Sequence, residues 1–138
     1  MKVEVRYYSR GGNTEKLARA IADAAGVPAL TVSEPLTEDT DILFLGSAVY
    51  AAGVDDEVKK FIQGIDVKVG RVVNFSTAAF IKSTYKTVER LLREKDIPMD
   101  PEEFACRGAF AFLHKGRPDE ADQKAAAAFA KRILEKTP

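Results

Sequence analysis

The feature that most constrains the fold of this chain is the alternation, from end to end, of short apolar runs with amphipathic stretches. Apolar residues three and four positions apart predict helices, and compact apolar runs between them predict strands. The strands are expected at residues 3–8, 29–32, 42–46, 71–75 and 108–113. The helices are expected at residues 13–25, 54–65, 84–95 and 120–136. Strict alternation of this kind predicts an α/β fold with three layers, in which helices cover both faces of a parallel sheet.

The same periodicity predicts which residues are buried. Residues 42–46 are almost wholly apolar, which is typical of a strand buried on both faces. The helices are expected to bury Leu17, Ile21 and Ala24; Val58, Phe61, Ile62 and Ile65; Val88, Leu91 and Leu92; and Ala125, Ala128, Phe129, Ile133 and Leu134. Residues 33–41 are polar and too few for more than one helical turn, so one face of the sheet should be less covered there.

Composition excludes several classes of function. The length of 138 residues corresponds to a single domain spanning residues 1–138. Lys plus Arg and Asp plus Glu number 21 each, so no uniformly basic surface is available to bind nucleic acid. One cysteine, Cys106, and one histidine, His114, exclude an internal disulfide and a multi-thiolate metal site. Because no apolar run is long enough to span a bilayer, we expect a soluble cytoplasmic protein that does not contact membranes.

The first candidate site is the segment that follows the first strand, because doubly wound folds bind ligands at the carboxyl ends of their strands. Residues 9–14 read Ser-Arg-Gly-Gly-Asn-Thr. Two glycines allow close backbone approach, and hydroxyls and free amides of a first helical turn suit one phosphate monoester. This sequence matches neither the P-loop motif nor the dinucleotide-binding motif. The alternative is an ordinary turn in which Asn13 or Thr14 caps the helix.

Two further segments follow the third and fourth strands. Residues 46–53 place small residues around Tyr50, which is suited to stack on a planar ligand. Residues 74–80 are also small and hydroxylic and end in Phe80, so they are expected to form the other wall of the same slot. The alternative for both aromatic residues is packing within the domain itself.

With these three segments in order, the chain resembles a short-chain flavodoxin along essentially its whole length. Ser9, Gly12, Asn13 and Thr14 match the phosphate-binding pattern of that family, and residues 46–53 with residues 57–62 resemble its second flavin loop. Residues 118–123 resemble the start of its last helix. The resemblance implies a flavodoxin-like sandwich with a five-stranded parallel sheet in the order 2-1-3-4-5, and one non-covalently bound FMN.

The resemblance also implies which residues bind the cofactor. The phosphate would lie on the amides of residues 10–14 and the hydroxyls of Ser9 and Thr14, and the flavin ring would lie between the other two segments. The implied set is Ser9, Arg10, Gly11, Gly12, Asn13 and Thr14; Ser47, Ala48, Val49, Tyr50, Ala51, Ala52 and Gly53; and Ser76, Thr77, Ala78, Ala79 and Phe80. No catalytic residue and no metal ligand are expected.

The chain departs from the family pattern in three ways. Gly11 stands where the family has a hydroxyl, which removes a charge-assisted contact worth about 1.5–3 kcal/mol and predicts weaker FMN retention. The Arg10 guanidinium is available to offset part of that loss. The third segment lacks the acidic, glycine-rich character of the family. The net charge is zero, whereas typical flavodoxins are strongly acidic.

The leading functional hypothesis is an FMN-binding electron carrier that shuttles electrons between a reductase and a partner enzyme. We expect a monomer, and a redox carrier more than a self-sufficient enzyme. One alternative is a small FMN-dependent reductase that uses NAD(P)H to reduce quinones. Another is a flavin-free protein that keeps the fold and binds a different ligand.

Overall fold

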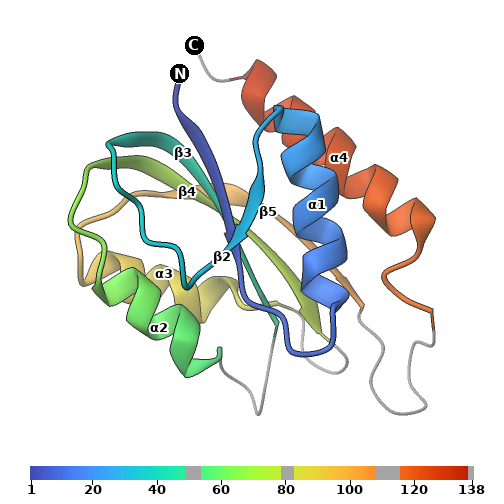
Figure 1. The fold of residues 1–138 in the computed structure, drawn as a ribbon, viewed down its shortest axis with the longest axis horizontal. Helices are drawn as coiled ribbons and strands as arrows, with labels where there is room; N and C mark the ends of the chain where they lie inside the picture. The colour runs from blue at the N-terminus through green and yellow to red at the C-terminus, as the bar shows by residue number, and fades with distance from the viewer. Residues whose placement is uncertain (49–53, 79–82, 108–115, 137–138) are drawn as a thin grey trace.

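The computed structural model of the protein describes residues 1–48, 54–78, 83–107 and 116–136. Five parallel strands form one sheet in the order β2-β1-β3-β4-β5, as expected (Figure 1). The elements are β1 (Val3–Tyr7), α1 (Asn13–Ala25), β2 (Ala29–Thr31), β3 (Thr40–Ala48), α2 (Asp56–Gln63), β4 (Val69–Ala78), α3 (Tyr85–Arg93), β5 (Met99–Arg107) and α4 (Glu120–Glu135).

Each face of the sheet has its own core. Helices α1 and α4 lie side by side on one face, and α2 and α3 cover the other (Figure 1). In β3, Ile42 and Phe44 point to the α1–α4 side, whereas Leu43 and Leu45 point to the α2–α3 side. All four side chains are almost completely buried, which confirms that this strand is covered on both faces.

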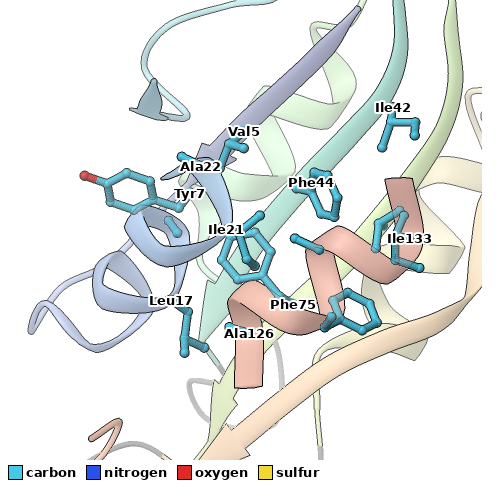
Figure 2. Packing of buried hydrophobic residues seen from close by; sticks show 14 residues of the cluster. Val5, Tyr7, Leu17, Ile21, Ala22, Ile42, Phe44, Phe75, Ala126 and Ile133 are labelled. Atoms are coloured by element: carbon cyan, nitrogen blue, oxygen red, sulfur yellow. The ribbon is translucent and has the colours of Figure 1, made fainter. Parts of the chain in front are cut away.

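The α1–α4 core is built from small and large apolar side chains that fit together. Leu17 and Ile21 of α1 and Ala126 and Ile133 of α4 belong to one buried cluster with Phe75, which Figure 2 shows between the two helices and the sheet. The predicted apolar faces of α2 and α3 are confirmed, because each of their expected residues is buried.

The buried face of α4 differs from the expected one. Ala125 and Ala128 are exposed, and the buried stripe is Ala126, Phe129, Ala130 and Ile133. The error has a physical cause: in a run of alanines, side chains of equal size and polarity do not mark which side of the helix faces the sheet. The helix begins where expected, since Asp119 and Asp122 form a reciprocal capping box there.

The fifth strand also differs from the expected one. It is Met99–Arg107, pairing Asn74 with Glu103 and Ala78 with Arg107, whereas residues 108–113 were expected to form it. Residues 108–115 lie outside the described residues. The segment 99–107 contains Pro101 and two glutamates, and it lacks the apolar run of a central strand. An edge strand tolerates this, because the pairing register shifts around Pro101, where β5 has extra residues opposite β4.

The connection between β2 and β3 contains no helix, which interrupts the strict alternation of strands and helices. Val32 and Leu36 of this connection are buried and extend the α2–α3 core. The buried Arg6 of β1 fixes it: the Nε donates to the Glu34 carbonyl at 2.8 Å, and Nη1 donates to Glu4 at 2.7 Å. A short irregular segment therefore covers this corner of the sheet in place of a helix.

Candidate functional site

The three candidate segments meet at the carboxyl edge of the sheet. Strand β1 ends beside β3, with Tyr7 opposite Gly46, and β3 ends beside β4, with Ser47 opposite Ser76 and Ala48 opposite Thr77. Helix α1 begins at this same edge (Figure 1). The central strands thus bring together the described parts of all three segments.

Helix α1 begins with a glycine turn and has no capping side chain. Its N-cap is Gly12, which has φ of 90° in the left-handed region that suits glycine. The Gly12 amide donates to Ser9 Oγ at 2.9 Å, and the Lys16 amide donates to the Gly12 carbonyl at 3.2 Å. The alternative of an ordinary cap by Asn13 or Thr14 is therefore wrong. Amides of the first helical turn and the positive end of the helix dipole face this edge, as an anion site requires.

Gly11 lies exposed at the turn. A Cβ built there meets no atom within 4 Å, and the backbone of Gly11 is not in the left-handed region. The turn consequently leaves open space beside the amides, where a phosphate group can approach the backbone. This space and the helix N-terminus are suited to a phosphate group.

Thr14 links this turn to the end of β4. Its side chain is completely buried, and its Oγ1 lies 3.0 Å from Oγ1 of Thr77. Two expected site residues from different segments are thus in direct contact. A hydroxyl has one donor and two acceptor positions, so Thr14 can accept from Thr77 and still donate to a phosphate.

Arg10 points to the start of α2. Its Nε donates to Asp55 Oδ2 at 3.0 Å, and its Nη2 contacts the same oxygen. Asp55 is the N-cap of α2, and its Oδ1 accepts from the Glu57 amide at 3.0 Å. Burial opposes ionisation of Asp55, but the Glu57 amide and the Arg10 guanidinium together hold the pKa of this carboxyl below its ordinary value. The Arg10 charge is therefore neutralised by a carboxylate, and it is not left for a phosphate alone.

Behind the edge lies a buried polar network that involves Ser47 and Ser76. Ser47 Oγ donates to Thr84 Oγ1 at 2.9 Å, and the Asn74 amide nitrogen donates to the same oxygen at 3.1 Å. The Thr84 amide lies 3.5 Å from Ser76 Oγ. The side chains of Ser47 and Ser76 thus join β3 and β4 to the start of α3, which places their hydroxyls inside the protein.

Asn74 and Thr84 belong to this network but not to the implied set of cofactor-binding residues, although Asn74 begins the third candidate segment. A signal for Asn74 exists in the sequence, because an amide within the apolar strand Val72–Phe75 must find hydrogen-bond partners when it is buried. Thr84 has no comparable signal, since threonines before helices are common.

Seven expected site residues lie outside the described residues: Val49, Tyr50, Ala51, Ala52, Gly53, Ala79 and Phe80. The stacking role of Tyr50 therefore stays a prediction. Ala48 and Ala78 end their strands beside these segments, half-buried and buried respectively.

Other kinds of site have no support in the described part of the chain. Among residues 1–48, 54–78, 83–107 and 116–136, no three His, Cys, Asp or Glu side chains are grouped as metal ligands. Within those same ranges, no helix has the length and apolar character needed to cross a bilayer. Cys106 is half-buried on β5, and burial raises the pKa of its thiol to about 12.

Comparisons with known proteins agree with this architecture. A protein of Methanocaldococcus jannaschii with no assigned function is 33% identical over 149 aligned positions, which cover 97% of this chain and 99% of the relative. Among solved structures, a flavodoxin from the domain Archaea superposes with a TM-score of 0.81 at 16% identity, covering 99% of this chain and 98% of that one. Oxidised flavodoxin 1 from Bacillus cereus gives a TM-score of 0.73 at 15% identity, with both chains covered completely. The model of the flavodoxin domain matches residues 4–115, and the chain therefore belongs to the flavodoxin domain family.

Proposed function

We propose that this protein binds FMN non-covalently and carries electrons between a reductase and an acceptor protein. The observation that carries the proposal is the glycine turn at the N-terminus of α1, with open space beside Gly11 and the positive φ of Gly12. The chain belongs to the flavodoxin domain family, and this turn lies at the carboxyl edge of the sheet. The second and third candidate segments begin at the same edge, where β3 and β4 end.

The proposal gives each residue of this turn a role. The amides of residues 10–14 receive the phosphate, and Ser9 holds the turn in shape through the Gly12 amide. Thr14 donates its hydroxyl to the phosphate while it accepts from Thr77. FMN, when bound, supplies the redox chemistry, and the protein supplies its orientation and its electrostatic surroundings.

A carrier is favoured over a reductase by the chemistry of the three segments. Residues 9–14, 47–53 and 76–80 contain no carboxylate and no imidazole that would give a proton to a bound quinone. The NAD(P)H-dependent quinone reductase is the second candidate. Steady oxidation of NAD(P)H by quinone with this protein alone, beyond the rate with free FMN, would favour it over the carrier.

The test of the proposal is a titration of the apoprotein with FMN. Flavin fluorescence should be quenched with a one-to-one end point, and native mass spectrometry should show the mass of one FMN on the folded protein. Riboflavin, which lacks the phosphate, should bind more weakly. Absence of any quenching and of any bound FMN mass would contradict the proposal and would favour a flavin-free binding protein.

Two variants test binding of the FMN phosphate and binding of the flavin ring separately. Thr14→Ala should weaken binding of FMN more than binding of riboflavin, whereas Thr14→Ser keeps the hydroxyl and serves as its control. Tyr50→Ala should alter the absorbance spectrum of the bound flavin if this residue stacks on the ring.

A further inference from the structure

One ion pair connects the first candidate segment to the start of α2. Arg10 belongs to the turn before α1, and Asp55 directly precedes α2, two residues after the second segment (residues 46–53). Its two donor groups, Nε and Nη2, contact the same carboxylate oxygen, Oδ2. Two donors on one acceptor fix the orientation of the guanidinium more closely than a single contact does.

The two partners differ in exposure. The Arg10 side chain is 58% exposed, but the Asp55 side chain is only 8% exposed. The second oxygen of Asp55 is already occupied by the Glu57 amide at the start of α2. Removal of Arg10 would leave a nearly buried carboxylate with one partner fewer, so Arg10 is strongly favoured to stay on Asp55.

We propose that Arg10 and Asp55 are positioning residues for the cofactor phosphate: their ion pair holds the turn of residues 9–12 against α2 in the shape that receives the phosphate. This inference rests on the proposed function, because it deepens the role of the same site. Arg10 acts through Asp55 and does not need to touch the phosphate. The amides of the turn remain the phosphate ligands.

The chain offers matched variants to test this. Asp55→Asn removes the charge but keeps an oxygen that caps α2, since asparagine is as good an N-cap as aspartate. Arg10→Gln removes the other charge. Arg93→Gln breaks an Arg–carboxylate pair with Glu89 on α3, in which both side chains are exposed, and serves as the control for loss of a surface charge.

Dissociation constants for FMN and for riboflavin should be measured for the wild type, both single variants, the double variant and the control. Each single variant should weaken FMN binding about fivefold, the double variant should be no weaker than the singles, and riboflavin binding should be unchanged. Arg93→Gln should behave as the wild type. A loss confined to FMN distinguishes positioning of the phosphate from a general loss of stability.

Hydrogen exchange of the apoproteins tests the same pair without the cofactor. Amides of residues 9–16 should exchange faster in Arg10→Gln and Asp55→Asn than in the wild type and the control. If FMN does not bind the wild type, the proposed function fails, and exchange alone decides whether the pair orders the turn.

Three results would overturn the inference. Weaker FMN binding in Arg10→Gln, with unchanged or tighter binding in Asp55→Asn, would mean that Arg10 contacts the phosphate itself. Losses that multiply in the double variant would mean that the two residues act independently. Unchanged exchange in both single variants would mean that the pair does not order the turn.

Discussion

At the scale of single residues, the site contains glycines that are under different structural constraints. Gly12 has a backbone conformation that other residues rarely adopt. Gly46 gives room to the ring of Phe75, because an added Cβ would lie 2.2 Å from Cε2 of that ring. Gly11 has neither constraint. Of these three glycines, Gly11 is therefore the one that can be replaced by a residue with a side chain without disturbing the fold.

Gly11→Thr should tighten FMN binding. The new hydroxyl would occupy open space beside the phosphate amides and add a charge-assisted hydrogen bond, worth about 1.5–3 kcal/mol or about tenfold and more in the dissociation constant. Fluorescence titration measures it, and Gly11→Ala is the control without a hydroxyl. Equal affinities for the two variants would show that no such bond forms.

Gly46→Ala should destabilise the protein by about 1–3 kcal/mol, because the buried Phe75 ring cannot move away without strain in the core. Urea unfolding measures the free energy. Combining the change with Phe75→Leu, which makes space, should recover part of the loss. An unchanged unfolding midpoint for Gly46→Ala would refute this account of the packing.

The Cys106 thiol should react slowly with iodoacetamide in the folded protein. Burial, followed in size by the nearby Asp122 carboxylate, raises its pKa to about 12 from an ordinary 9.0, so almost no thiolate exists near neutral pH. The protonated thiol favours the folded state below pH 9.0, and this contribution is lost as the pH rises toward about 12. Labelling should accelerate strongly in urea, and equal rates with and without urea would contradict the prediction.

At the scale of the elements, the periodicity of the sequence identified each helix of the described residues, the three inner strands β1, β3 and β4, and the edge strand β2. It failed at β5 because this edge strand, unlike β2, is held to its neighbours by ionic contacts and has no apolar run. Glu102 of β5 binds Lys136 just beyond α4 at 2.6 Å and Arg132 of α4, and the buried Asp100 binds Arg71 and Lys136. Contacts between residues so far apart in sequence leave no periodic signal.

For the candidate site, the sequence predicted the position of the turn but not the side-chain partners of its residues. The local residue pattern was enough to predict the turn at residues 9–14, because glycines and hydroxyl side chains directly after a strand are a local signal. The partners of Arg10, Thr14 and Ser47 are Asp55, Thr77 and Thr84, and each lies on another element. Local sequence does not encode these pairings, which arise only when the parallel strands align.

Acid should loosen the contact between β5 and the end of α4. Hydrogen bonds from Lys136, and then from Arg132, lower the pKa of Glu102 to about 2 from 4.5. The stabilisation is complete above pH 4.5 and is lost as the pH falls through about 2. Glu102→Gln should therefore unfold more easily than the wild type at neutral pH, with a difference that shrinks in acid. A difference independent of pH would exclude this origin.

At the scale of the whole molecule, the charges balance. With 21 basic and 21 acidic residues, the protein has no net field to attract or repel a charged partner at a distance. The rate of electron exchange with a partner protein should therefore depend weakly on salt. Stopped-flow measurements across a range of ionic strength would show this, and a rate that falls steeply with added salt would contradict it.

The segment between β2 and β3 has a practical consequence for the design of fusions. It links the outermost strand to the sheet, lacks a helix, and contributes only Val32 and Leu36 to the described core, while residues 33–35 and 37–39 are exposed. Foreign sequence inserted at Thr37–Asp39 would leave both cores and the carboxyl edge intact. A reporter domain inserted at residues 37–39 would label the protein and would leave both chain ends free for other fusions.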